Sequence, residues 1–161
     1  MARDRAFEEL VLAHGTFVYS LLVRFVRRRE TAEDLWQETF WAAARALERG
    51  ERLEKPEAWL RTLAVRKAVD CIRRQEVRAE LDGGTPEIEP AAPDAVGRAA
   101  EIEDELTALP PRERAAVLLA YQEGRPLSEV AALLEVPVGT VKTWLFRARA
   151  ALKRRWKDGA P

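Results

Sequence analysis

Apolar residues recur at intervals of three and four along most of the chain, which is the period of an amphipathic α-helix. The two-residue alternation of a half-buried strand is absent, and so is any long-period repeat. The pattern predicts seven helices, over residues 3–28, 31–48, 57–75, 99–108, 111–123, 127–134 and 139–156. We therefore expect an all-α fold.

Local signals mark where several of these helices begin and end. Thr31 followed by Asp34 resembles a capping box, and Gly50 is suited to end the same helix. Pro56 favours the first turn of the next helix, and Gly124 is a natural stop before Pro126. Gly15 is a possible break in the first helix.

The clearest interruption of the helical pattern is "AELDGGTPEIEPAAPDAVG", residues 79–97. It contains three prolines, paired glycines and five carboxylates, but no Lys or Arg. Such a composition is typical of a linker that buries no core of its own. On composition alone, a plain acidic tether is its simplest interpretation. We predict two small helical domains, 1–78 and 98–161, joined by this flexible linker.

Composition and charge narrow the class of protein. The 161 residues carry 27 basic and 27 acidic side chains. This balance argues against a protein that coats nucleic acid along its whole surface, but it is compatible with local basic patches that bind nucleic acid. A single cysteine, Cys71, excludes an internal disulfide framework. The charged N-terminus does not resemble a signal peptide, and no apolar run approaches the ~20 residues that span a bilayer. We expect a cytoplasmic protein without membrane insertion.

Nothing in the sequence resembles a catalytic or metal site. His14 is the only histidine, and no Ser-His-Asp, Cys-His or metal-spaced cluster occurs. The carboxylates lie at ordinary helical spacings from cations. We expect no enzymatic activity, no cofactor and no metal.

The last predicted helix has a basic face that also carries an aromatic residue. Val141, Leu145, Ala148 and Leu152 share the face expected to pack inward. The opposite face carries Lys142, Thr143, Phe146, Arg147 and Lys153. A short helix and the turn "EVPV" precede it, which is the helix-turn-helix design. Such a helix offers donors to base edges and phosphates, and an apolar group to thymine methyls. A solvated basic face with a stray Phe is the alternative.

The segment "WLRTLAVRKAVDCIRRQ", residues 59–75, also combines an aromatic residue with cations. Leu60, Val65 and Ile72 belong to its broad apolar face. The other face holds the candidate single-strand contacts Trp59, Arg66, Lys67, Arg73 and Arg74. An exposed aromatic beside cations suits single-stranded nucleic acid, since a base stacks while phosphates are neutralised. Packing of Trp59 against a neighbouring helix explains this segment equally well.

The segment "AEDLWQETFWAAARAL", residues 32–47, carries the opposite charge. Trp36, Phe40, Ala43 and Leu47 follow core spacing. A second stripe consists of Asp34, Gln37, Glu38 and Trp41. Carboxylates beside an outward Trp suggest a protein partner with a basic surface, because Trp is enriched at binding hot spots. An acidic solvated face with Trp41 tucked against its own domain is the alternative.

Taken in order, these segments resemble a bacterial RNA polymerase sigma factor of the extracytoplasmic-function type. "AEDLWQETF" looks like the polymerase-binding motif of domain two, and "AWLRTLAVRKAVDCIRR" like its promoter-melting and minus-ten-reading helix. "LPPRERAAVLLAYQEGRPLSEVAALLEVPVGTVKTWLFRARAAL" looks like domain four, which reads the minus-thirty-five element. The resemblance covers nearly all of the chain outside the first residues, the linker and the tail.

The resemblance implies a role for each group of residues. The stripe of Asp34, Gln37, Glu38 and Trp41 would bind core RNA polymerase. The minus-ten strand would meet Trp59, Arg66, Lys67, Arg73 and Arg74. The minus-thirty-five duplex would meet Lys142, Thr143, Phe146 and Arg147. The implied partners are core polymerase, promoter DNA and an anti-sigma protein.

The sequence departs from the family pattern at several of these positions. Glu135 stands where the family's turn often has Gly, so a left-handed backbone there would be strained or absent. Thr143 and Trp144 replace a common Ser-Arg, Lys67 replaces a frequent Asn, and the loop "RGERLEKPEA" lacks small polar residues. The rival hypothesis is a stand-alone helix-turn-helix regulator that binds duplex DNA without polymerase.

Overall fold

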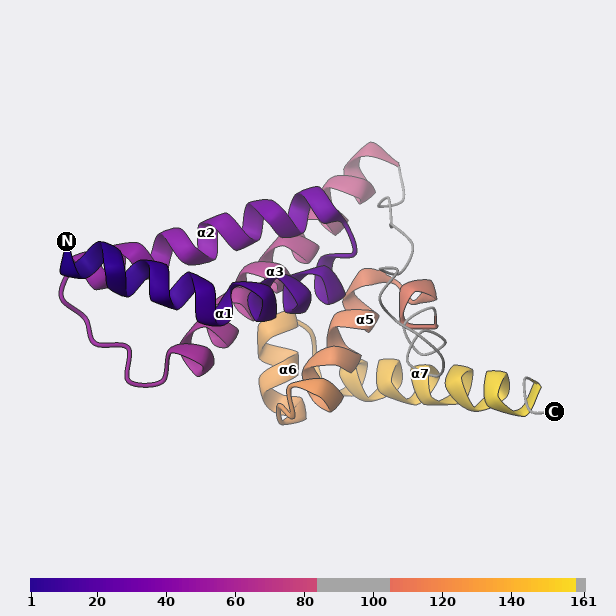
Figure 1. The fold of residues 1–161 in the computed structure, drawn as a ribbon. Helices are drawn as coiled ribbons and strands as arrows, with labels where there is room; N and C mark the ends of the chain where they lie inside the picture. Colours follow the sequence, from indigo (N-terminus) through magenta and orange to yellow (C-terminus); the bar gives the residue numbers. More distant parts are fainter. Residues whose placement is uncertain (84–104, 159–161) are drawn as a thin grey trace. The chain divides into compact units, whose positions relative to one another are not determined.

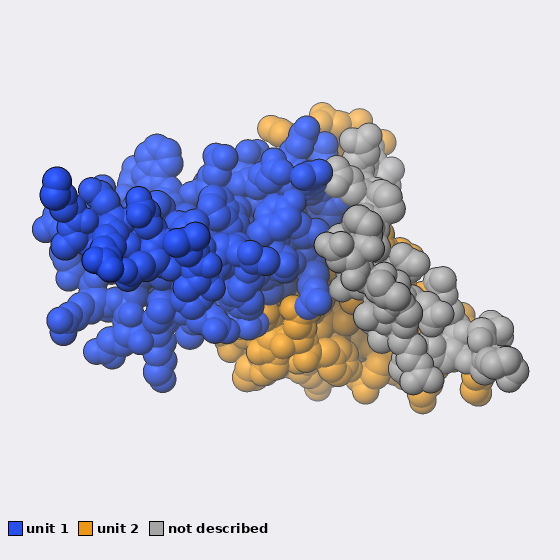
Figure 2. Space-filling model, viewed as in Figure 1, with its two compact units in different colours: residues 1–71 blue, residues 72–161 orange. Residues whose placement is uncertain are grey.

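The computed structural model describes residues 1–83 and 105–158 of the chain, and all regular structure in these two ranges is helical (Figure 1). The predicted all-α class is confirmed. Contacts divide the chain into two compact units, residues 1–71 and 72–161, coloured separately in Figure 2. Each unit has its own buried core.

Unit 1 begins with two helices that lie side by side, α1 (Ala2–Val26) and α2 (Arg29–Glu48). Helix α1 is not broken at Gly15. The backbone carbonyl of Gly15 accepts a hydrogen bond of 2.9 Å from the indole N–H of Trp36 on α2. A Cβ atom at Gly15 would lie 3.4 Å from the Trp36 ring, which is ordinary van der Waals contact.

The start of α2 differs from the sequence prediction, whereas its end agrees with it. The helix begins at Arg29, after Arg28, and no side chain caps it. The capping box expected at Thr31 is therefore wrong, because the helix has already begun two residues earlier. Gly50 adopts a φ of 78°, and its backbone N–H donates to the Leu47 carbonyl, as expected for a glycine that ends a helix.

Helix α3 (Pro56–Asp82) begins at the predicted proline but ends seven residues later than the expected end at residue 75. Up to Cys71 it belongs to unit 1, and the remainder belongs to unit 2. The buried core of unit 1 consists largely of aliphatic and aromatic side chains, among them Leu22, Phe25, Phe40, Leu60 and Val65. Trp36 and Leu47, also expected in this core, are half-buried.

Helix α1 has the length and composition of a membrane-crossing helix, the one such helix within the described ranges. An 18-residue window of it has a mean hydropathy of 1.4, and 33% of that window is buried. Core helices can have the same length and composition, and Val18, Leu22 and Phe25 of α1 are fully buried in unit 1.

Unit 2 contains the helix-turn-helix. Helix α5 (Pro111–Val117) continues into a π-helical turn, η1 (Leu118–Gln122), which ends before Gly124 with a φ of 63°. Helix α6 (Leu127–Leu134) follows, and then the long helix α7 (Val138–Asp158). Helix α7 packs on both α5 and α6 (Figure 1). The core is apolar and includes Leu119, Val130, Leu134, Val141 and Leu145.

The predicted linker lies mainly outside the described residues. Residues 79–82 are the last residues of α3, and Gly83 follows in a turn with a φ of 69°. Of the helix expected over 99–108, residues 105–108 are described and helical. The proposed domain boundaries, 1–78 and 98–161, therefore stay predictions.

Candidate nucleic-acid and protein interfaces

The turn between α6 and α7 has a left-handed residue despite the absence of glycine. Glu135 adopts φ 55° and ψ 45°, and its N–H bonds to the α6 carbonyls. The next residue, Val136, donates its N–H to the Ala131 carbonyl at 3.0 Å. The left-handed conformation costs a non-glycine residue about 1–2 kcal/mol. The helix-turn-helix geometry therefore forms at the position where the sequence led us to expect strain or a different turn.

Helix α7 presents all four predicted upstream-DNA residues on its surface. Phe146 is 71% exposed. Lys142, Thr143 and Arg147 are exposed beside it, while Val141 and Leu145 are buried. The Thr143 hydroxyl donates to the Gly139 carbonyl at 3.0 Å, which orients it along the helix. Trp144 is half-buried.

Arg147 has a partner that the sequence analysis did not identify. One terminal guanidinium nitrogen (Nη1) lies 3.4 Å from the Glu113 carboxylate on α5. The Arg147 side chain is 64% exposed and that of Glu113 only 13%. No spacing rule indicates this pair, because the two residues are separated by 34 positions in the sequence.

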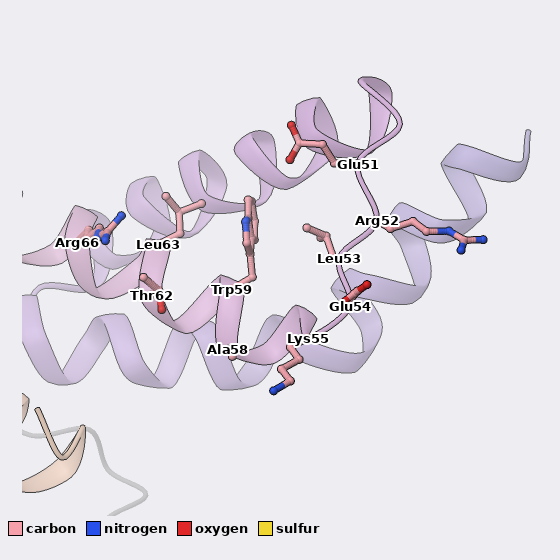
Figure 3. A pocket seen from close by; sticks show the side chains of 10 residues that line it. All are labelled: Glu51, Arg52, Leu53, Glu54, Lys55, Ala58, Trp59, Thr62, Leu63 and Arg66. Carbon is pink, nitrogen blue, oxygen red and sulfur yellow. The ribbon is translucent and has the colours of Figure 1, made fainter.

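Trp59 lines a cavity of about 620 Å³ between the start of α3 and the loop before it. In Figure 3, the side chains of Trp59 and Leu53 lie across from each other, whereas that of Arg52 points away. Leu63 and Arg66 of α3 complete the wall on one side. Trp59 is half-buried and Arg66 is exposed. The structure thus places the aromatic ring of Trp59 and the cation of Arg66 in the wall of the same cavity.

The other predicted single-strand residues lie along the same helix. Lys67 is half-buried, and its ammonium lies 3.5 Å from the Glu38 carboxylate of α2. Arg73 and Arg74 belong to the part of α3 that falls in unit 2. Arg73 pairs there with Glu135 of the helix-turn-helix. The five residues do not form one cluster within a single unit.

The predicted protein-binding stripe lies on the exposed face of α2. Asp34, Gln37, Glu38 and Trp41 are all exposed, and Trp41 retains 65% of its surface. The Arg45 guanidinium lies over the Trp41 ring, 5.6 Å from its centre. An exposed tryptophan within a stripe of acidic and amide groups is suited to a protein partner. No group of three or more His, Cys, Asp or Glu side chains suited to a metal ion occurs within residues 1–83 and 105–158.

Comparison with known proteins accounts for both units. Residues 10–78 match the family model of sigma-70 region 2, and residues 99–152 match that of sigma-70 region 4. The chain is 32% identical to the ECF RNA polymerase sigma factor SigE of Mycolicibacterium smegmatis over 92% of its own length and 60% of that protein. It is 33% identical to the RNA polymerase sigma factor CarQ of Myxococcus xanthus, covering 92% of this chain and 87% of CarQ.

A solved structure has the same fold. The sigma factor RpoE, crystallised with the anti-sigma factor NepR from Bartonella quintana, superposes with a TM-score of 0.59. It is 22% identical, and the match covers 97% of this chain and 99% of RpoE. The two matched regions in sequence order, and the relatives that are 32% and 33% identical, place the chain in the extracytoplasmic-function (ECF) group of the sigma-70 family of RNA polymerase sigma factors.

Proposed function

We propose that this sigma factor binds core RNA polymerase through the exposed stripe on α2 and directs it to promoters by two DNA contacts. Helix α7 reads the upstream, minus-thirty-five duplex, and the first half of α3 binds the minus-ten strand as the duplex opens. The observation that carries the proposal is Phe146, which is 71% exposed among cations on the second helix of a helix-turn-helix.

The upstream contact follows from the chemistry of the α7 surface. The major groove admits an α-helix, and its base edges offer acceptors to Lys and Arg. Thymine adds a methyl group that an exposed phenyl ring can contact. Lys142 and Arg147 supply the donors, and Phe146 supplies the apolar contact. The folded helix thus offers both chemistries on one face.

The minus-ten contact is supported by the cavity at Trp59. A base that has left the duplex gains stacking on an aromatic face, and a nearby cation neutralises phosphate. Trp59 and Arg66 line the cavity together. The loop residues Leu53 and Glu54 form its opposite side and replace the small polar residues that the family often has there. We expect this loop to set which base the cavity accepts.

The remaining roles are part of the same proposal. An anti-sigma protein is a further partner, and the chain works inside the cytoplasm without catalytic residues of its own. A stand-alone regulator would need no polymerase-binding surface, whereas the α2 stripe keeps four exposed residues on one face. That surface favours the polymerase-dependent function.

The test is reconstitution with core polymerase. The complex should transcribe a defined subset of promoter fragments that core polymerase alone does not use. Asp34→Ala combined with Glu38→Ala should weaken the complex in a competition assay without lowering the melting temperature. Asp4→Ala with Glu9→Ala, which removes two exposed carboxylates from α1, is the matched control. Duplex binding that is equally selective without polymerase would favour the stand-alone regulator.

A further inference from the structure

The contact between Glu113 and Arg147 joins a sheltered carboxylate to an exposed cation. Glu113 lies in the first turn of α5, and its side chain is 13% exposed. Arg147 lies on the outer face of α7, and one guanidinium nitrogen is held 3.4 Å from the Glu113 carboxylate. Helices α5 and α7 pack directly on each other within unit 2. The carboxylate is therefore held by the core, while the cation faces outward.

This arrangement has a consequence for how Arg147 meets DNA. A long, exposed arginine samples many rotamers, and fixing it on a base costs conformational entropy. Arginine has five N–H donors in a rigid fork, so engaging one nitrogen leaves donors for a second partner. A guanine read through O6 and N7 requires that fork in one orientation. A carboxylate anchored by packing can select that orientation before DNA arrives.

We propose that Glu113 is a positioning residue for Arg147 and thereby a determinant of base selectivity at one position of the upstream element. This inference rests on the proposed function, in which α7 reads duplex DNA. Glu113 touches no base in this assignment. It acts through the guanidinium that it orients, and the base pair selected contains guanine.

The alternative roles of Glu113 differ in their effect on binding. A carboxylate that acts only by its charge repels all DNA alike, so its removal strengthens binding to every sequence. A carboxylate that only stabilises the α5–α7 packing affects every base position together. A positioning carboxylate has a different signature, because its removal lowers the preference at one position while binding to unrelated duplex does not fall.

The experiment uses the complete sigma factor bound to core polymerase. A promoter recovered by the transcription assay is randomised in its upstream element, and bound and input duplexes are sequenced. The variants are Glu113→Gln, Glu113→Asp, Arg147→Ala and the Glu113→Gln/Arg147→Ala double variant. Glu129→Gln is the matched control, because it removes a carboxylate from another Arg–Glu pair, that with Arg125 on the same unit. Melting temperatures identify any variant that fails to fold.

Arg147→Ala should abolish the preference for one base pair at one position. Glu113→Gln should weaken that same preference by up to about fivefold, the range of a partly exposed ion pair. It should have no further effect in the Arg147→Ala background. Glu113→Asp retains the charge but shortens the reach, so it should weaken the preference without strengthening binding to random duplex. Glu129→Gln should leave the preference intact.

Three results would overturn the inference while leaving the proposed function in place. In the first, Arg147→Ala weakens binding equally for all upstream sequences. In the second, Glu113→Gln changes binding to all upstream sequences by the same factor. In the third, Glu113→Asp keeps the full wild-type preference for the one base pair. A wild-type complex without any upstream base preference would instead remove the proposed role of α7 together with this inference.

Discussion

Phe146 and Trp59 are both aromatic residues set beside cations, but their surroundings differ. Phe146 is 71% exposed on α7 and has Lys142 and Arg147 on the same face. Trp59 is half-buried in the wall of a cavity. In the proposed function, the exposed Phe146 ring on α7 contacts the groove of an intact duplex. The proposed partner of the Trp59 ring is a base that has already left the duplex.

We therefore expect the two alanine variants to fail at different steps. Phe146→Ala should impair binding to the upstream duplex before any strand opens. Trp59→Ala should leave this closed complex nearly intact and reduce strand opening, since a stacked base contributes about 1–3 kcal/mol. A duplex-binding assay combined with permanganate footprinting of melted thymines separates the two steps.

Tyr121→Ala is the control for losing an exposed aromatic side chain, because Tyr121 is 57% exposed in η1 and lies outside the predicted DNA contacts. On a promoter that is already melted, Trp59→Ala should lose only the binding energy of the base stacked on the ring, because strand opening is no longer required. If both variants fail at the same step, or if Trp59→Ala unfolds unit 1, Trp59 is a packing residue and its assignment to melting is wrong.

At the scale of elements, Glu38 and Lys67 join the two proposed binding surfaces of unit 1. Glu38 belongs to the stripe on α2, and Lys67 to the side of α3 that we propose binds the minus-ten strand. Glu38→Gln should free the lysine and remove a repulsive charge. We expect binding of the free protein to a labelled single-stranded oligonucleotide to tighten by up to about fivefold, the range of a partly exposed ion pair.

Asp34→Asn removes the same charge one turn earlier on α2 and should tighten oligonucleotide binding less. A Glu38→Gln/Lys67→Met variant should lose the gain. Equal effects of the two single variants, measured by fluorescence anisotropy at one salt concentration, would mean that general repulsion explains the result. The ion pair would then have no specific part in it.

A second contact between elements involves Glu76, which serves as the N-terminal cap of α5. Pro110 precedes the helix and supplies no side-chain cap. The Glu76 carboxylate instead accepts the backbone N–H of Arg112 at 3.1 Å and lies 2.6 Å from the Arg112 guanidinium. Burial raises the pKa of Glu76 above its ordinary value of 4.5, although the hydrogen bond and charge of Arg112 oppose the rise.

The raised pKa gives a signed prediction for stability. The folded state retains the Glu76 proton to higher pH than the unfolded state does, so this group's contribution is fully present below pH 4.5 and is lost as pH rises through the folded pKa. Glu76→Gln should remove that part of the pH dependence. Denaturant titrations from below pH 4.5 to neutral pH should show the wild-type free energy of unfolding falling relative to that of the variant.

Glu48→Gln, an exposed carboxylate on α2, controls for loss of one charge. Parallel pH profiles for wild type and Glu76→Gln would contradict the prediction. A Glu76→Ala variant should be less stable than Glu76→Gln at every pH, because alanine leaves the first turn of α5 without an acceptor.

At the scale of the whole molecule, the acidic segment 79–97 is predicted to connect two separately folded parts. Glutamyl endopeptidase is a suitable probe, because this segment contains Glu87, which is followed by Ile88, but no Lys or Arg. We expect the first cut in the free protein to fall there, after the end of α3 at Asp82, and to leave two helical fragments. Mass spectrometry of early time points identifies the cut.

Exposed glutamates within helices, such as Glu33 on α2, are the internal comparison, since a hydrogen-bonded helix resists the extended conformation that proteases need. Cleavage after Glu33 that precedes cleavage after Glu87 would contradict a linker. Resistance of the whole chain would show that the two parts are locked together in solution.

Local pattern in the sequence was sufficient for most of the helices and for the exposed faces. The spacing of Val141 and Leu145 against Phe146 placed the aromatic ring outward, and the structure confirms its exposure. Gly50 and Gly124 adopt positive φ where helices were expected to stop. These features depend on residues within one or two turns of each other, so helical period and backbone preference suffice to predict them.

Tertiary structure decided the features that join distant residues or override local preference. The pairs of Glu113 with Arg147 and of Glu38 with Lys67 exist because packed helices bring carboxylate and cation within 4 Å. Glu135 adopts a left-handed backbone because the packing of α6 and α7 outweighs its own preference. Helix α3 continues past its predicted end to Asp82, and Glu76 in this extension contacts Arg112 of α5. The local sequence pattern does not show which distant residues come close together, so these contacts could be identified only from the folded structure.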